Sequence, residues 1–517
     1  MLLTILPACR HWVFIAVALT ILIVTDNNPQ TRFAEATGKL FEFPEPPPQA
    51  LDDPNFRQIV GEPVLLTDYI SRGQIDEGRR ASAVVINETV IPELAVFNNQ
   101  GRVTFTGFLT VNKDCDSNLF FWFVPAKEGP ESAPLVLWLQ GGPGGSSLFG
   151  LFVENGPWIL DSNLNLAFRY YDWTRTHSII YVDSPVGTGF SYTNGEQCYA
   201  KNQEDVARDL STFLSQFFLV FPEFSNQQFY IFGESSGGKS AAVLAHKITA
   251  GNSNNLGGSL TKTGEVDMSI SISKKINLAG VAIGNSLCDP FSMSHWGNFL
   301  YGIGLIGSQD QEYFSKISNA IRDKIRENKY TIASELIDNL ITGLLTPDHA
   351  TYFGKVTGAE YYFNFLWYDT PPDFAYYSKF LDLPHVRRAI HVGHKVFQNS
   401  TKVQQNLLED LSQSVHRYIE SVLDSGVKML FYNGQLDITA AFELTQYFIH
   451  KLHWRYDAGF QAAPRDKWKN GTEISGYIQR HRNLALALVL NAGHMVAYDQ
   501  PSRAFDLLML FTKGRII

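Results

Sequence analysis

Ser235, Asp437 and His494 are the residues of this chain whose types fit together as a catalytic set. A serine hydroxyl becomes an effective nucleophile only when an imidazole takes its proton. A carboxylate bonded to the other ring nitrogen fixes the imidazole tautomer and stabilises the imidazolium. Each residue alone is commonplace, because a single aspartate or histidine in a loop usually has no chemical role. Together they predict acyl transfer, with Ser235 as nucleophile, His494 as base and Asp437 as its partner.

Ser235 lies at the centre of the sequence GESSG, residues 233–237, which fits the pattern G-x-S-x-G. Residues 229–232 are aromatic or β-branched and predict a buried strand, and the segment to residue 248 favours a helix. A sharp turn from strand to helix needs glycine on both sides of its apex and exposes the apical serine. A glycine- and serine-rich turn without chemistry is the alternative.

The other two members also follow predicted strands. Asp437 comes after the apolar run at 427–432, and His494 comes after the run at 484–490. Two further apolar runs, 135–139 and 178–183, end in glycine-rich loops. Because the carboxyl ends of parallel strands meet at one edge of a sheet, these loops are expected to converge. The chain order Ser, Asp, His at such strand ends predicts an α/β-hydrolase fold with a mostly parallel central sheet.

The change in pattern along the chain predicts its organisation. We expect a signal peptide at 1–25, a proline-rich extension or propeptide-like segment at 26–85, and the first part of the core at 86–289. Residues 290–425 lose the alternation of strand and helix, which predicts an inserted, mainly helical cap. The core resumes at 426–517. Residues 103–111 and 118–124 read as an antiparallel pair of strands.

The N-terminus favours the secretory pathway. Residues 12–24 are apolar apart from Thr20, which suits a signal peptide and is short for a membrane span of about 20 residues. A signal anchor is the alternative. Sequons at Asn87, Asn399 and Asn470 predict glycosylation. We therefore expect a secreted or lysosomal protein without a stable membrane anchor after signal cleavage.

Four cysteines leave the disulfide pattern open. Cys9 falls in the predicted signal peptide, so Cys115, Cys198 and Cys288 remain. A bond between Cys198 and Cys288, with Cys115 free, is the expected pairing, and three buried thiols are the alternative.

The composition of the chain limits the classes of molecule that it is expected to bind. A net charge of −9 argues against nucleic acid, and the sequence has no metal-ligand cluster or nucleotide-binding loop. We expect no metal and no cofactor. A homodimer is left open.

Five motifs, in order, resemble the serine carboxypeptidase family: WLQGGPGGSS at 138–147, DSPVGTGFSY at 183–192, GESSGGKS at 233–240, YNGQLDI at 432–438 and AGHMVAYDQP at 492–501. The resemblance is strongest to the vitellogenic-carboxypeptidase-like branch and covers the chain from about residue 90. It implies a serine exopeptidase that removes C-terminal residues from peptides.

The resemblance also implies roles for further residues. Gly142 and Ser236 match the backbone oxyanion donors, and a set of four residues matches the site for the substrate carboxylate: Trp138, Gln140, Glu154 and Glu234. Two adjacent carboxyls cannot both ionise cheaply, so one stays protonated and can donate a hydrogen bond to a third carboxylate. Raising the pH ionises the pair, which predicts an acidic optimum for peptide cleavage.

Ser236 departs from the family pattern, which has tyrosine at this position. Its backbone N–H remains, but the lost ring alters the substrate pocket. An acyltransferase on the same triad is one alternative, and a catalytically weak yolk, storage or binding protein is another. The retained pair Glu154 and Glu234 favours the peptidase, because an acyltransferase has no need to bind a free C-terminus.

Overall fold

The computed structural model describes residues 53–84, 102–253, 275–345, 350–359 and 361–517. The predicted signal peptide, residues 26–52 of the proline-rich extension and Asn87 lie outside the described residues, whereas residues 53–84 of the extension are described. Within the described ranges, no helix is both long enough and apolar enough to cross a membrane.

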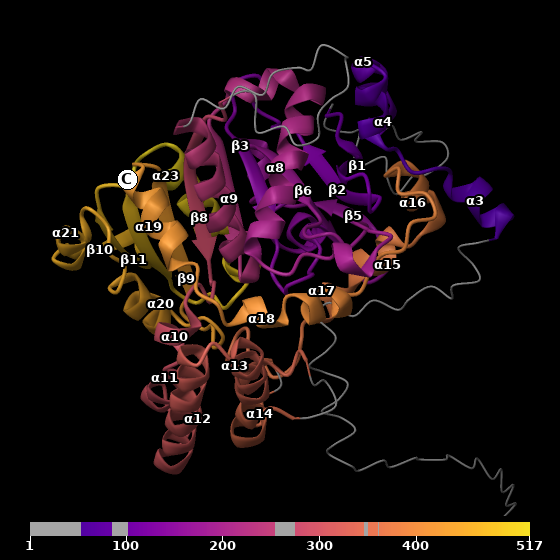
Figure 1. Ribbon diagram of the computed structural model, residues 1–517. Coiled ribbons are helices and arrows are strands. Elements are labelled where there is room, and N and C mark those ends of the chain that lie inside the picture. The colour runs from indigo at the N-terminus through magenta and orange to yellow at the C-terminus, as the bar shows by residue number, and fades with distance from the viewer. Residues whose placement is uncertain (1–52, 85–101, 254–274, 346–349, 360) are drawn as a thin grey trace, which may run out of the picture.

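A ten-stranded sheet forms the centre of the molecule, in the order β1-β2-β6-β3-β7-β8-β9-β12-β11-β10 (Figure 1). The six strands from β6 to β12 pair in parallel, and both margins are antiparallel. The bounds are β1 Phe105–Asn112, β2 Ser117–Val124, β3 Leu135–Leu139, β6 Ser178–Val182, β7 Phe229–Glu234, β8 Leu278–Gly284, β9 Lys428–Gly434, β10 Arg465–Asn470, β11 Glu473–His481 and β12 Leu484–Val489. The predicted α/β-hydrolase fold and the antiparallel pair at its start are confirmed.

The parallel strands form where the sequence is continuously apolar, because both faces of this part of the sheet are covered. Every residue of β3, β6 and β7 is buried. The main covering helices are α8 Gln203–Val220, α9 Ser236–Ser253, α19 His416–Asp424, α20 Phe442–Ile449 and α23 Pro501–Thr512. Asn202 caps α8, its side chain accepting from the Asp205 N–H at 2.9 Å. In α23, the Phe511 ring packs against Tyr230 of β7.

Between β8 and β9 the described residues form helices and no strand. Their bounds are α10 Pro290–Met293, α11 Trp296–Gly302, α12 Ser308–Arg326, α13 Tyr330–Ile337, η6 Asp338–Thr342, α14 Tyr352–Thr357, η7 Pro372–Ala375, α15 Tyr376–Leu381, α16 Pro384–Ala389, α17 Thr401–Asn406 and α18 Leu408–Leu411, followed by α19. Helices α11 to α14 stand together beyond one end of the sheet, and α19 lies beside α9 in the layer over it (Figure 1).

Shorter elements complete the fold. They are α3 Pro54–Val60, α4 Leu66–Ser71, α5 Ile75–Ala81, α7 Ser147–Phe149, η2 Gly150–Glu154, β4 Trp158–Leu160, β5 Leu166–Phe168, η3 Trp173–Arg175, η4 Glu196–Cys198, η5 Pro222–Asn226, α21 Asp457–Gln461 and α22 Val496–Asp499. Strands β4 and β5 form a small antiparallel sheet of their own.

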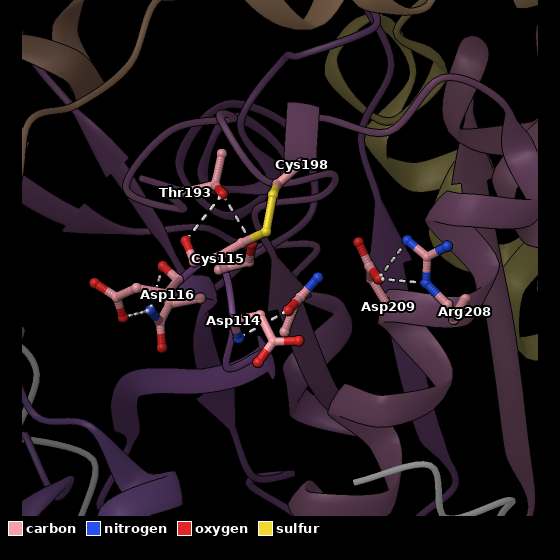
Figure 2. The surroundings of a disulfide bond; sticks show 10 residues. Asp114, Cys115, Asp116, Thr193, Cys198, Arg208 and Asp209 are labelled. Atoms are coloured by element: carbon pink, nitrogen blue, oxygen red, sulfur yellow. Dashed lines mark hydrogen bonds and ion pairs between the residues drawn. A yellow bond between two sulfur atoms is a disulfide. The ribbon is translucent and has the colours of Figure 1, made fainter. Parts of the chain in front are cut away.

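The predicted disulfide between Cys198 and Cys288 is wrong, because Cys198 is bonded to Cys115, with their Cα atoms 6.3 Å apart (Figure 2). Cys115 lies in the turn between β1 and β2, and the loop after β6 folds back onto it. The Asn194 N–H donates to the Cys115 carbonyl at 2.9 Å, as does the Thr193 hydroxyl at 3.3 Å. Cys288 is a fully buried free thiol beyond the end of β8, where burial raises its pKa to about 12.

Candidate active site

Ser235 occupies a strained turn between β7 and α9. Its φ of 55° is a left-handed conformation that non-glycine residues rarely adopt. The flanking glycines allow this turn, since a Cβ on Gly233 would meet the Gly237 carbonyl oxygen at 2.2 Å, and one on Gly237 would meet the Leu139 carbonyl oxygen at 2.3 Å. The chain geometry is therefore that of a nucleophile elbow, which presents the serine above the end of the sheet.

Asp437 and His494 are hydrogen-bonded at the ends of β9 and β12. His494 Nδ1 lies 2.9 Å from Asp437 Oδ2, and both side chains are buried. The other carboxylate oxygen, Oδ1, accepts from the Thr439 N–H at 3.0 Å and from the Thr439 hydroxyl at 2.7 Å. The Phe363 ring packs on the imidazole with centroids 4.6 Å apart. These contacts fix the orientation of the imidazole.

One cleft is lined by two residues of the predicted triad, and the third lies behind it. Ser235 and His494 both line it, with Asp437 behind the histidine. His494 Nε2 is buried and makes no hydrogen bond within the described part of the chain. This nitrogen is the one that would take the serine proton. Most of the remaining wall is apolar, with Leu287, Trp296, Ile337, Ile341, Leu344, Leu345 and Met495 among its residues.

The predicted oxyanion donors Gly142 and Ser236 line the same cleft. Gly142 has a φ of 118°, which favours glycine. The preceding glycine permits close approach, because a Cβ on Gly141 would lie 2.4 Å from the Ser235 Cβ. Ser236 is the first residue of α9, so its N–H points outward at the positive end of the helix dipole.

A row of hydrogen bonds marks the end of the cleft beyond Ser235. The Trp138 indole Nε1 donates to Gln140 Oε1 at 2.8 Å, and Gln140 Nε2 donates to Glu234 Oε1 at 2.9 Å. Because the indole is only a donor, it fixes which way the amide faces. Gln140 and Glu234 line the cleft.

Glu154 lies behind this row. It is 1% exposed, and neither of its oxygens makes a hydrogen bond of good geometry with the residues that the structure describes, although Glu234 and Gln140 are near enough to lower its pKa. Burial outweighs them and raises the pKa of Glu154 to about 7. Burial also raises the pKa of Glu234 well above its usual range, with the charge of Glu154 as a further cause. The two carboxyls therefore hold at least one proton at neutral pH.

Two buried residues that the sequence analysis did not assign support the loops of the site. Asn285 follows β8; its Nδ2 donates to the carbonyl of His494, and its Oδ1 accepts from the Gly434 N–H at 3.0 Å. Asp183 follows β6 and accepts from the Ser146 hydroxyl at 2.5 Å and from the Phe190 N–H at 2.9 Å. In the sequence, the position of both residues directly after predicted strands was the feature that could have identified them.

The remaining predicted sites lie away from the cleft or at its edge. Asn470, at the end of β10, is exposed, whereas Asn399 is half-buried and its Oδ1 accepts from the Thr401 N–H at 3.2 Å. Glycosylation at both stays a prediction.

Residues 97–514 match the family model described as serine carboxypeptidase. Similar proteins include a probable serine carboxypeptidase CPVL from Homo sapiens, 43% identical over 88% of this chain and 90% of its own. A venom serine carboxypeptidase from Apis mellifera is 41% identical over 88% and 92%, and a vitellogenic carboxypeptidase from Aedes aegypti is 38% identical over 87% and 90%.

Among solved structures, a prohormone-processing carboxypeptidase from Saccharomyces cerevisiae superposes with a TM-score of 0.70 at 22% identity. The match covers 84% of this chain and 96% of that one, and it supports the fold. From the family model and from relatives near 40% identity, the chain belongs to the serine carboxypeptidase family.

Proposed function

We propose that this protein releases C-terminal residues from peptides through an acyl-enzyme on Ser235, and that it works best at acidic pH. The observation that carries the proposal is the row Trp138, Gln140 and Glu234, with Glu154 behind it, beside the nucleophile in one cleft. Such a row suits a free carboxylate and would give an enzyme that acts at chain ends.

In the first step, Ser235 Oγ attacks the carbonyl of the last peptide bond while His494 Nε2 takes the hydroxyl proton. The oxyanion that forms accepts hydrogen bonds from the N–H groups of Gly142 and Ser236. His494 then gives its proton to the amine of the departing residue, and Asp437 stabilises the imidazolium in between. Water, activated by His494, releases the peptide from Ser235 in the second step.

The carboxyl pair accounts for the proposed acidic optimum. With Glu154 protonated, its proton can go to Glu234, which leaves the Glu234 proton for the substrate carboxylate. When Glu154 ionises, near pH 7, it becomes the acceptor for that proton, and the substrate loses its donor. A free C-terminus then faces an anion instead of a hydrogen-bond donor.

The pair also supports the peptidase over an acyltransferase, which has no free C-terminus to bind. A storage or binding protein would have no use for the strained turn at Ser235. Passage through the secretory pathway, to the outside or to the lysosome, remains part of the proposal and is supported by the apolar stretch at 12–24.

Hydrolysis of N-blocked dipeptides, each as free acid and as C-terminal amide, tests this function. Wild type is compared at about pH 5 and pH 7.5 with Ser235→Ala, and Ser425→Ala at the end of α19 serves as a remote control. We expect cleavage that depends on Ser235 and favours the free acid at low pH. Cleavage of amides alone would argue against the carboxylate site. Folded wild type that neither cleaves peptides nor reacts with a fluorophosphonate would refute the proposed enzyme.

A further inference from the structure

Glu154 is carried by an unusual element. Residues Gly150–Glu154 form η2, a π-helical turn, and it closes with the Asn155 N–H donating to the Gly150 carbonyl at 2.9 Å. π-Helical turns are rare in proteins, and those that occur are often found at functional sites. A Cβ on Gly150 would lie 2.3 Å from the Trp138 Nε1, so η2 sits directly against the indole that orients Gln140. The position of Glu154 therefore depends on what holds this turn.

Arg169, which follows β5, holds it from outside the cleft. Its Nη2 donates to the carbonyl of Phe152 at 2.7 Å and to that of Trp158 at 3.2 Å, and its Nε donates to the carbonyl of Gly156 at 2.9 Å. One of these carbonyls precedes Glu154 in the chain and two follow it. A single planar guanidinium thus fixes the backbone on both sides of the buried carboxyl, which a flexible ammonium group does less well.

The charge of Arg169 acts on Glu154 and also on Tyr181, Asp172 and Asp373. Within the described part of the chain it has no ion-pair partner, and its bonds go to neutral carbonyls. Burial lowers its pKa to about 10, so it remains a cation at neutral and acidic pH. The positive charge lowers the pKa of Glu154, against the larger effect of burial.

We propose that Arg169 is a positioning residue for free-acid substrates, which holds η2 so that Glu154 stays within reach of Glu234. This inference rests on the proposed function of the carboxyl pair. Arg169 itself touches neither the substrate nor the reacting atoms. It acts through Glu154, so its effect must be confined to substrates that carry a free carboxylate.

Other titratable groups also influence the pair. They lie on the strands and loops packed around it: Tyr181 of β6, Tyr432 of β9, and Asp437 and His494 beyond β9 and β12. Asp172 and Asp373 act on Arg169 itself. Among these described groups, the Tyr181 hydroxyl bonds beside η2, donating at 2.8 Å to Oδ1 of Asn155, the residue that follows this turn.

The test compares Arg169→Gln and Arg169→Lys with wild type in the ratio of kcat/KM for the free acid to that for the amide. In Arg169→Gln we expect this ratio to fall about tenfold through KM, while the amide changes less than about twofold. The pH at which the ratio declines should rise, because a positive charge near Glu154 is lost. Arg169→Lys keeps the charge, so it should keep this midpoint while losing part of the affinity.

Arg480→Gln is the control, because Arg480 of β11 also donates to main-chain carbonyls, those of Arg515 and Ile516 in the C-terminal segment. It should leave the ratio unchanged. In a Glu154→Ala background, Arg169→Gln should have no further effect on the ratio. The proposal would be overturned if Arg169→Gln lowered kcat/KM equally for the free acid and the amide. It would also be overturned if Arg169→Gln changed the ratio as much in the Glu154→Ala background as in wild type. If Arg169→Gln does not fold, the same comparisons with Arg169→Lys decide.

The wild-type measurement separates the two levels of inference. A wild type without preference for the free acid at low pH refutes the proposed function and the role of Arg169 with it. A wild type with that preference, unchanged in folded Arg169→Gln, refutes only the role of Arg169.

Discussion

The proposed pH dependence of free-acid cleavage is a prediction that follows from one buried carboxyl. Burial raises the pKa of Glu154 to about 7, so the group is about nine-tenths protonated at pH 6 and about one-tenth at pH 8. The substrate carboxylate can be bound well only in the protonated form, since ionised Glu154 withdraws the proton that Glu234 would donate. kcat/KM for a free-acid peptide should therefore fall about tenfold from pH 6 to pH 8.

The assay isolates the effect of the carboxyl pair by comparing kcat/KM for a free-acid peptide with kcat/KM for the matching amide. The chemical step at Ser235 and His494 is common to acid and amide substrates. The ratio of their kcat/KM values removes that contribution and leaves the carboxyl pair. In Glu154→Gln the residue at 154 cannot ionise, so the step near pH 7 should disappear. Glu131→Gln, at an exposed acid before β3, is the control and should retain the step.

Two results would refute this reasoning. A ratio that stays constant between about pH 5 and pH 8.5 would mean that the pair does not receive the substrate carboxylate. A step that persists at the same pH in Glu154→Gln would mean that another group titrates. A shift of the step, as expected for Arg169→Gln, changes its midpoint without removing it.

Three further changes have expected outcomes. Ser236→Tyr places a ring in the apolar part of the cleft, and it should lower kcat/KM for a bulky penultimate residue about tenfold relative to alanine, measured with a blocked dipeptide series. Cys115→Ser removes the disulfide with Cys198, a bond that closes a loop with a sequence separation of 83. The free energy of unfolding, measured by urea titration, should fall by about 2–4 kcal/mol. An unchanged midpoint of unfolding would contradict this prediction. Burial lowers the pKa of His177 to about 3, so below about pH 6.5 the unfolded chain binds a proton that the folded chain does not. The contribution of neutral His177 to the free energy of unfolding is therefore present above about pH 6.5 and is lost as the pH falls, by roughly 2 kcal/mol at pH 5. His177→Gln should abolish this loss. An equal decline in the variant would show that another group causes it.

The sequence predicts the central sheet well because its strands are long apolar runs that end in glycine-rich loops. Such runs suit strands that are buried on both faces, so the strand type and the mostly parallel sheet follow from them. The hairpin of β10 and β11 was missed for the opposite reason. In β10 only Trp468 is buried, and its charged residues, typical of an edge strand, hide the alternation that predicts a strand.

The disulfide could not be predicted, because pairing depends on which loops meet. Cys115 and Cys198 are joined because the segment after β6 returns to the turn between β1 and β2. The sequence contains no pattern that describes this return. The burial of Glu154 behind Gln140 and Glu234 could not be predicted for the same reason. A motif gives the order of residues along the chain, but it does not give their distance from a cleft.

Residues that support the site are invisible to motif analysis for a chemical reason. Arg169 and Asn285 donate to main-chain carbonyls, which every residue possesses, so their partners carry no signature in the sequence. Ser235 and His494, in contrast, must be serine and histidine because the reaction needs their side chains. Side chains that bond to backbone fix where a loop lies, and loop position decides whether the reactive groups meet. In this protein the pH response of the carboxyl pair thus depends on a guanidinium that no catalytic motif contains.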